Sequence, residues 1–233
     1  MHMYDIEYNG KVASDMKILV KERPDIPAPK KKSAAVEVAG RDGNLIESDG
    51  TYEDITIVVA FNYITNPDTW AEVFRRARRW LLSSGSHELK LLDDSGYFYK
   101  VKSVEISTNE RTSLRIGNFT ASFLCEPYQY VDAGKMNYSL DSVKFNHYEV
   151  SHPQYIISGD GVCELYANGN IVKITVDDYI TVDTERMMAY KDDVLQNTSV
   201  AGEYEDLYLM SGKNELSVTD GFEIKVIPNW RSV

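Results

Sequence analysis

The residues of this sequence best suited to chemistry are three pairs of adjacent aspartates, Asp93-Asp94, Asp177-Asp178 and Asp192-Asp193. A glycoside hydrolase needs two carboxyl groups about 5 to 10 Å apart, one as acid and one as base or nucleophile. Adjacent residues on a strand point to opposite faces, however, and each pair lies at a predicted turn, where Asp bonds to its own backbone. We therefore expect no catalytic residues and no enzyme. A β-sandwich hydrolase is the weakest of the functions that we consider.

Metal and cofactor motifs are also missing from the sequence. The four histidines form no HxxxH or HxH pair, and Cys125 and Cys163 form no CxxC spacing. The sequence contains no GxSxG, no Walker lysine and no GxGxxG after a predicted strand. We expect no metal site, no cofactor and two reduced, buried thiols.

The charge of the chain limits its partners. The formal net charge is −11, and it is uneven. Residues 1–134 carry 17 basic against 20 acidic residues, a net charge of −3, while residues 135–233 carry 8 against 16, a net charge of −8. An acidic chain repels phosphate backbones and anionic lipids. We expect neither nucleic acid nor membrane as a partner.

Two basic clusters depart from this acidic background. One is the run Lys30, Lys31 and Lys32, and the other is formed by the arginines of one predicted helix, Arg75, Arg76, Arg78 and Arg79. Such a helix face is commonly solvated, and it can also form ion pairs with a neighbouring subunit or bind an anionic ligand. We name both clusters as candidate oligomer-interface residues and keep the other readings open.

A single helix is predicted, over residues 67–83. Asn66 can cap its start, Pro67 suits the first helical position, and Asp68 favours the positive end of the helix dipole. Trp70, Val73, Phe74, Ala77 and Leu81 then follow helical spacing, with the arginines on the outer side, until Ser83-Ser84-Gly85 ends the pattern. The five apolar residues form the buried face of the predicted helix.

Short strands and turns surround this helix. Asn9-Gly10 between alternating residues predicts a hairpin near the start of the chain. The three prolines between residues 24 and 29 exclude a helix or central strand, so residues 24–32 are expected to form an extended arm. A turn is expected at Gly40, Arg41, Asp42 and Gly43, and a buried strand at residues 56–61. Residues 1–134 are therefore predicted to be an N-terminal β domain with one helix.

Residues 135–233 have a different pattern. A break at Glu126-Pro127 precedes a stretch in which eight short strands are expected, separated by turns such as Gly159-Asp160-Gly161 and Asn168-Gly169. One of these strands is expected at residues 204–209. Strand spacing of this kind is typical of a β-sandwich or jelly roll. We predict a C-terminal β-sandwich domain, which makes the whole protein mainly β.

The end of the chain is expected to be tied into this second domain. Phe222, Ile224, Val226 and Trp230 are all even-numbered, so in a continuous strand they point to the same face. Arg231 follows Trp230. A docked tryptophan buries roughly 150 to 250 Å². We therefore assign Trp230 and Arg231 a structural role, with Trp230 facing inward.

Several of these motifs, taken in order, resemble the distal tail protein (Dit) family of long-tailed phages of Gram-positive bacteria. They are the turn at residues 40–43, the single helix, the sequence Leu91-Leu92-Asp93-Asp94-Ser95-Gly96, the exit Phe123-x-Cys125-x-Pro127-Tyr128, Gly212-x-Asn214 and Pro228-x-Trp230-Arg231. Each motif alone is weak, and their order over nearly the whole chain is the specific feature. Residues 135–152 contribute no motif to the resemblance.

This resemblance implies a structural protein of the virion tail tip, or baseplate. The family's N-terminal domain assembles into a homohexameric ring, and its C-terminal domain is a galectin-like β-sandwich. The ring joins the tail tube protein, the tape measure and the tail-tip proteins. Because no signal peptide precedes the predicted domains, synthesis in the host cytoplasm is expected before assembly.

A carbohydrate-binding β-sandwich for host-surface polysaccharide is the alternative function. Exposed tyrosines would provide flat faces for sugar rings, and the candidates are Tyr166, Tyr179, Tyr190, Tyr204 and Tyr208. The same residues suit core and strand-surface packing, which is the reading we favour. We expect no glycan binding.

Overall fold

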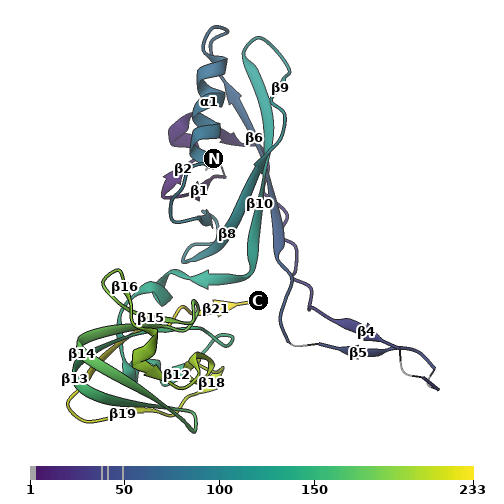
Figure 1. Cartoon of the computed structure of the whole chain (residues 1–233). Helices are drawn as coiled ribbons and strands as arrows, with labels where there is room; N and C mark the ends of the chain where they lie inside the picture. The colour runs from purple at the N-terminus through teal and green to yellow at the C-terminus, as the bar shows by residue number, and fades with distance from the viewer. Residues whose placement is uncertain (1–3, 38, 41, 49) are drawn as a thin grey trace. The chain divides into compact units, whose positions relative to one another are not determined.

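The computed structural model describes residues 4–37, 39–40, 42–48 and 50–233 (Figure 1). Contacts between Cα atoms divide the chain into two compact units, Met1–Gln129 with Val233, and Tyr130–Ser232. The division after Gln129 lies between the predicted break at Glu126-Pro127 and the predicted start of the second domain at residue 135. The protein is mainly β with one α-helix among the described residues, as predicted.

The first unit is built on one large antiparallel sheet with the strand order β2-β1-β7-β8-β10-β6-β3, and β9 pairs with β10. Its strands are β1 (Ile6–Tyr8), β2 (Lys11–Val12), β3 (Leu19–Val20), β6 (Ile55–Ile64), β7 (Glu88–Leu91), β8 (Tyr97–Ile106), β9 (Glu110–Arg111) and β10 (Ile116–Val131). A separate hairpin consists of β4 (Ala34–Val36) and β5 (Leu45–Glu47).

The predicted N-terminal hairpin is confirmed. Tyr8 pairs with Lys11, and the two residues between them, Asn9 and Gly10, have φ values of 51° and 70°. Both residue types adopt this left-handed conformation readily, and two such residues in a row make the turn that matches strand twist. The side chain of Asn9 also anchors the hairpin, since its Nδ2 donates to the Ser83 carbonyl at 3.1 Å.

The helix exists, although it is shorter than predicted. α1 spans Trp70–Leu81, and the residues before it form a turn in which the Thr69 amide bonds to the Asn66 carbonyl at 3.0 Å. The predicted start at Pro67 is therefore wrong by about one turn. The side chain of Thr69, the residue before the helix, makes no capping hydrogen bond to it.

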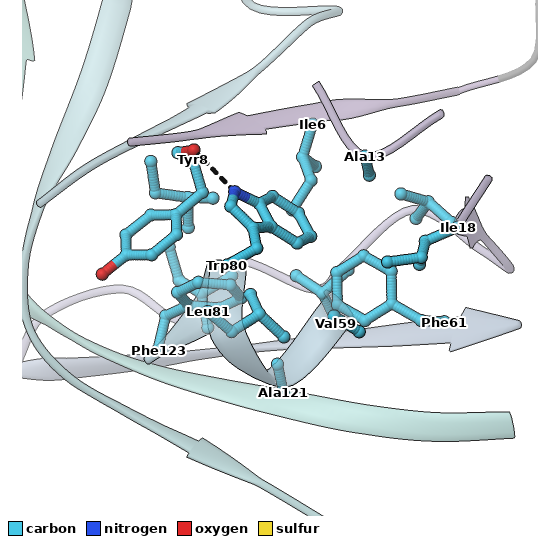
Figure 2. Close-up of a cluster of buried hydrophobic side chains, with 14 of the residues drawn as sticks. Ile6, Tyr8, Ala13, Ile18, Val59, Phe61, Trp80, Leu81, Ala121 and Phe123 are labelled. Carbon is cyan, nitrogen blue, oxygen red and sulfur yellow. Dashed lines mark hydrogen bonds between the residues drawn. The ribbon is translucent and has the colours of Figure 1, made fainter. Parts of the chain in front are cut away.

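The buried face of α1 is also displaced from the predicted one. Val73, Ala77, Trp80 and Leu81 are buried, whereas Trp70 and Phe74 are only half-buried. Trp80 lies on the centre of the face and was missing from the predicted set. Trp80 also donates from Nε1 to the Tyr8 carbonyl at 2.8 Å, which joins the helix to β1 (Figure 2).

The core of the first unit lies between α1 and the sheet. Figure 2 shows Trp80 and Leu81 packed with Val59, Phe61 and Phe123. In β6 burial alternates residue by residue, with the odd-numbered side chains from Ile55 to Tyr63 in the core. The prediction of a fully buried strand at residues 56–61 is therefore wrong, because only one face of this antiparallel strand is covered.

The strand itself is not interrupted at Glu126-Pro127. β10 continues to Val131, and Pro127 lies beyond Cys125, the last residue that pairs with β6. A proline lacks a backbone N–H, and at this place it removes no hydrogen bond from that ladder.

The second unit contains the remaining strands. They are β11 (Tyr138–Ser139), β12 (Phe145–Asn146), β13 (Gln154–Ala167), β14 (Asn170–Asp183), β15 (Met188–Lys191), β16 (Val194–Leu195), β17 (Val200–Ala201), β18 (Gly212–Lys213), β19 (Leu216–Val218), β20 (Glu223–Ile227) and β21 (Arg231–Ser232). Most of them form one sheet with the order β11-β20-β13-β14-β15-β16, while β12 pairs with β18.

Two long strands stand where short strands were predicted at residues 155–157, 163–167, 171–176 and 179–182. β13 and β14 pair along their full length, from Gln154 with Asp183 to Ala167 with Asn170. The predicted turn at residues 159–161 is therefore wrong. Gly159 and Gly161 have φ values of 145° and 109°, so these glycines let the strand deform locally without leaving the ladder. The predicted turn at Asn168-Gly169 is confirmed as the link between the two strands.

Residues 204–209 form a further exception. The structure has a 3-10 helix at Tyr204–Leu207 where a strand was predicted. Leu207 and Leu209 are buried, and the Leu207 carbonyl accepts a 2.8 Å hydrogen bond from the buried hydroxyl of Tyr155. Alternating apolar residues in a short segment are compatible with a strand or with a 3-10 helix. The hydrogen bond from Tyr155 favours the 3-10 helix.

Candidate oligomer interface

The last three residues of the predicted arm, which spans residues 24–32, lie at the base of the β4–β5 hairpin. The Lys32 amide donates to the Thr51 carbonyl at 2.9 Å, the Glu53 amide donates to the Lys30 carbonyl at 2.8 Å, and Lys31 forms a bridge with Tyr52. The three lysines thus lie on a paired strand, with exposed side chains. We call residues 30–53 the arm.

The arm presents apolar side chains to solvent. All described residues of β4 and β5 are exposed, including Val36 and Leu45 at 37% each and Ile46 at 63%. Val36 pairs with Leu45 across the ladder. A two-stranded hairpin without a covered face has little stability of its own in water, and exposed apolar surface on such an element indicates an interaction site.

The turn predicted at residues 40–43 lies at the far end of the arm, between β4 and β5. Gly40 and Gly43 have φ values of 83° and 78°, which explains glycine at these two positions. Asp42 lies in a bend between them, and Arg41 is outside the described residues.

At its base the arm contacts the large sheet through aromatic rings. The rings of Tyr52 and Tyr128 meet edge to face with centroids 5.9 Å apart, and the Lys31 ammonium lies 5.9 Å from the centre of the Tyr52 ring. This contact fixes the base of the arm and leaves the apolar residues of β4 and β5 uncovered.

The four arginines of α1 are placed differently from one another. Arg75, Arg78 and Arg79 are exposed, and Arg78 lies 6.0 Å from the centre of the Phe74 ring. Arg76 is half-buried and makes an ion pair with Glu72 at 3.4 Å, one turn earlier on the helix. Exposed pairs of this kind contribute little stability. The helix arginines and the arm lysines are held by different elements.

A groove of about 520 Å³ runs beside the first turns of α1. Three basic residues and one acidic residue contribute to its lining, which consists of Lys17, Ile64, Thr65, Asn66, Thr69, Glu72, Val73, Arg76 and Arg115. Arg76 is the only one of the four predicted helix arginines among these lining residues. Lys17 and Arg115 could not be predicted as neighbours of Arg76 from the sequence, because the three residues lie far apart along the chain and only the fold brings them together.

The chain end is tied into the second unit by the motif that we singled out. The Arg231 guanidinium donates to the Val150 carbonyl at 2.7 Å and contacts the His152 ring nitrogen at 3.0 Å. Asn229, at φ 50°, donates from its side chain to the His152 carbonyl at 2.9 Å. The Val131 amide donates to the Trp230 carbonyl at 3.0 Å. The last strand is therefore part of the unit and not a tail.

Trp230 is half-buried, whereas Ile224 and Val226 on the same predicted face are buried. Its ring lies 5.0 Å from the Tyr138 ring and 5.9 Å from the Tyr148 ring, and its buried Nε1 has no hydrogen-bond partner. The backbone of Trp230 leaves no room for a side chain at Gly134, where an added Cβ would lie 2.7 Å from the Trp230 nitrogen.

Replacing Trp230 with alanine is expected to lower the free energy of unfolding of the second unit by about 2 kcal/mol, the value for burying one large apolar side chain. Complete burial would cost more, and the half-exposed ring limits the loss. Chemical unfolding of the full chain, followed by far-UV circular dichroism, measures the change. Exposed Val194, replaced with alanine, is the control and should unfold like the parent. A variant that also unfolds like the parent would show that the ring does not stabilise the unit.

The two cysteines are free and buried. Burial raises the pKa of the Cys125 thiol to about 12 and that of the Cys163 thiol to about 11, so both are protonated at neutral pH. The Tyr179 hydroxyl donates to Asp192, and Lys191 lies 3.7 Å from Asp178. In the part of the chain that the structure describes, no three His, Cys, Asp or Glu side chains are grouped to hold a metal ion.

The tyrosines considered for sugar binding are all half-buried. The Tyr208 ring is stacked on His152 at a centroid distance of 4.0 Å, and the Tyr204 hydroxyl lies 3.5 Å from the Asn197 side-chain oxygen. Burial is the main cause of a raised pKa for Tyr190, Tyr204 and Tyr208. None of the helices in the described residues is long and apolar enough to span a bilayer.

Comparison with known proteins adds one finding. No family model matches the sequence, and no curated protein matches it. Among solved structures, the crystal structure of the Dit protein of SPP1 matches with a TM-score of 0.67 and 12% sequence identity. That protein is described as a paradigm of the hub adsorption apparatus in phages that infect Gram-positive bacteria. The match covers 99% of this chain and 99% of that one, so the chain shares the fold of SPP1 Dit from end to end.

Proposed function

We propose that this protein is a distal tail protein, a structural hub of a phage tail tip. The observation that carries the proposal is the match to SPP1 Dit, because it covers both units in one alignment. A match to one unit alone would indicate only a common β fold, since one fold serves many functions. The motifs at residues 40–43 and 228–231 support the same family independently of the fold.

The hub assembles through its first unit into a ring, which we propose to be a homohexamer. The exposed apolar residues of the arm support self-assembly, since a solitary hairpin gains stability when a neighbour covers it. The helix arginines and the arm lysines are the candidate polar contacts around such an interface. The tail tube protein, the tape measure and the tail-tip proteins are the proposed partners of the ring, and its place is the virion. The role is structural and involves no catalysis.

The full chain is expected to form a closed oligomer in solution. Light scattering after size-exclusion chromatography measures its mass against the 26.5 kDa monomer, and electron microscopy counts the copies in the ring. Residues 1–134 should assemble like the full chain, because the proposed interface lies within them. If both proteins remain monomeric at high concentration and low salt, self-assembly without a template fails, and with it the ring as proposed here.

A further inference from the structure

The groove of about 520 Å³ beside the first turns of α1 is positively charged, in a chain whose net charge is −11. Its lining contains three cations, Lys17, Arg76 and Arg115. The one acidic residue of the lining is Glu72, so three positive charges and one negative leave a net charge of +2. The Glu72 carboxylate already pairs with Arg76 at 3.4 Å. No acidic side chain among the described residues lies within ion-pair distance of Lys17 or Arg115, so these two cations are available to an anionic partner.

Backbone hydrogen bonds hold the walls of this groove in place. The Thr65 amide donates to the Arg115 carbonyl at 2.9 Å, which joins the loop after β6 to the loop after β9 at one end of the first unit (Figure 1). The hydroxyl oxygens of Thr65 and Thr69 lie 2.7 Å apart, so the same loop is bonded to the residue before α1. The Ser113 hydroxyl accepts from the amides of Arg115 and Ile116 at 3.2 Å and 3.1 Å. The charged side chains thus extend from a fixed backbone.

Lys17 stands at a position where a glycine is usual. It follows the 3-10 helix Ser14–Met16 in the left-handed conformation, with φ 63°, and its amide donates to the Ser14 carbonyl at 2.9 Å. Glycine or asparagine is common at such a helix end, whereas a lysine there is strained. Strained residues concentrate at functional sites. A glycine would relieve the strain, and it would also remove one of the three cations of the groove.

Aliphatic side chains border these charges. Ile64, which also lines the groove, is 64% exposed, and its cross-strand partner Ile116 is 39% exposed. Leu114, next to Arg115 in the loop after β9, is 70% exposed. Exposed apolar side chains grouped beside polar ones indicate an interaction site, since protein interfaces combine an apolar centre with a polar rim. The volume of the groove also lies in the range of about 300 to 1,000 Å³ that is usual for ligand sites.

The partner that fits this groove has both chemistries. Guanidinium and ammonium groups bind carboxylates, and an arginine can do so through two parallel hydrogen bonds. The exposed aliphatic residues call for apolar side chains in the same segment. A nucleic acid duplex fits less well, because its phosphates offer nothing to these side chains. Exposed acidic residues outside the lining, such as Asp15 and Asp68, which are close to Lys17 and Thr69 in the sequence, would also repel it.

We propose that this groove binds an acidic segment of a different protein, with carboxylates of the segment on the three cations of the lining and one of its aliphatic side chains on Ile64. All the residues that make the groove belong to one chain, so the site is complete in a monomer and does not depend on the ring proposed above. The acidic character is required of the segment alone, because a partner that is acidic over its whole surface would be repelled by the rest of this chain.

Fluorescence anisotropy with a defined peptide tests the site. The probe is a short fluorescein-labelled peptide of glutamates with a pair of leucines at its centre, and the full chain is titrated into it at low salt. Saturable binding is expected, and added salt should weaken it, because surface ion pairs are screened. Arg115→Glu is expected to weaken binding about tenfold and Lys17→Gly about threefold, while Arg115→Lys keeps the charge and most of the affinity. Lys17→Gly also suits the left-handed backbone, so its loss of binding cannot come from added strain.

Two comparisons separate the groove from the charge of the whole chain. Lys213→Glu changes the net charge as much as Arg115→Glu does, at an exposed position of the second unit, and it should bind the probe like the parent. A probe with serines in place of its leucines should bind the parent about tenfold more weakly. That difference should shrink in Ile64→Ser, which removes the aliphatic side chain from the groove.

The proposal is overturned if the probe does not bind saturably, if the serine probe binds as tightly, or if Lys213→Glu weakens binding as much as Arg115→Glu. Duplex DNA that binds as tightly as the probe, and is lost in the same variants, would make the groove a nucleic-acid site instead. Groove variants that are monomeric in light scattering where the parent assembles would make the groove a contact between copies. A parent that stays monomeric and binds the probe would refute the ring and leave this site in place.

Discussion

Replacing Trp80 with alanine is expected to lower the free energy of unfolding of the first unit by about 3 to 5 kcal/mol, the usual cost of removing a buried aromatic side chain. Trp80 is 3% exposed and joins α1 to the sheet. Its ring lies 6.3 Å from that of Tyr8 and 6.2 Å from that of Phe61, both edge to face. The substitution also leaves the Tyr8 carbonyl without the donor that it has at 2.8 Å.

Urea unfolding of the full chain measures this loss. The transition of the first unit should move to lower urea concentration while that of the second unit stays. Because the stability of a domain is only about 5 to 15 kcal/mol, the expected loss is a large part of it. Trp80→Phe keeps most of the packing and should lose less. Trp70→Ala is the matched control, because Trp70 is a half-buried tryptophan on the same helix. Equal losses at Trp70 and Trp80 would contradict the central role of Trp80.

The elements that local chemistry determines could be predicted from the sequence. Asn9-Gly10 and Asn168-Gly169 make turns because both residues of each pair adopt positive φ at low cost. The helix was visible from its apolar spacing. The start of the helix was predicted wrongly, because Asn66 and Pro67, the expected first residues, belong to a turn that precedes the helix. Trp80 was missed, although it stands seven residues after Val73 and three after Ala77, which is the spacing of one helix face.

Elements that depend on tertiary contacts could not be predicted in the same way. Gly159 and Gly161 carry the signal of a turn, and only the pairing with residues 176 to 178 shows that they deform a continuous strand. Pro127 carries the signal of a break, and it is tolerated because the β6 ladder has already ended. The 3-10 helix at Tyr204–Leu207 depends on the buried hydroxyl of Tyr155, which lies far away in the sequence.

Only the charged residues of the candidate interface, the three lysines and the four helix arginines, could be identified from the sequence. Runs of lysine and arginine are conspicuous in an acidic chain, and their role in assembly stays a prediction. The outward face of β6 and β10 consists of the even-numbered residues 56–64 and 116–124, all uncharged, and gives no signal in either strand alone. Its ten residues become one surface when the register pairs Val58 with Ser122 and Ile64 with Ile116. Register between distant strands is what the sequence pattern leaves open.

Asn214 is a similar case, because its sequence context indicates a turn and the structure gives it a larger role. It is 1% exposed. Its side-chain oxygen accepts from the Met210 amide at 2.8 Å and from the Asn168 side chain at 2.9 Å. Its side-chain nitrogen donates to the carbonyls of Met210 at 2.9 Å and Gly212 at 3.2 Å. One side chain thus joins the loop before β19 to the β13–β14 turn.

Replacing Asn214 with leucine is expected to lower the free energy of unfolding of the second unit by about 3 to 5 kcal/mol, since each buried polar group left unpaired costs about 1 to 3 kcal/mol. Asn170→Leu, at an exposed position next to the same turn, is the control and should change stability little. Asn168→Ala combined with Asn214→Leu should lose less than the sum of the two single losses, because they share one hydrogen bond. Additive losses in urea unfolding would show that the two asparagines stabilise the unit separately.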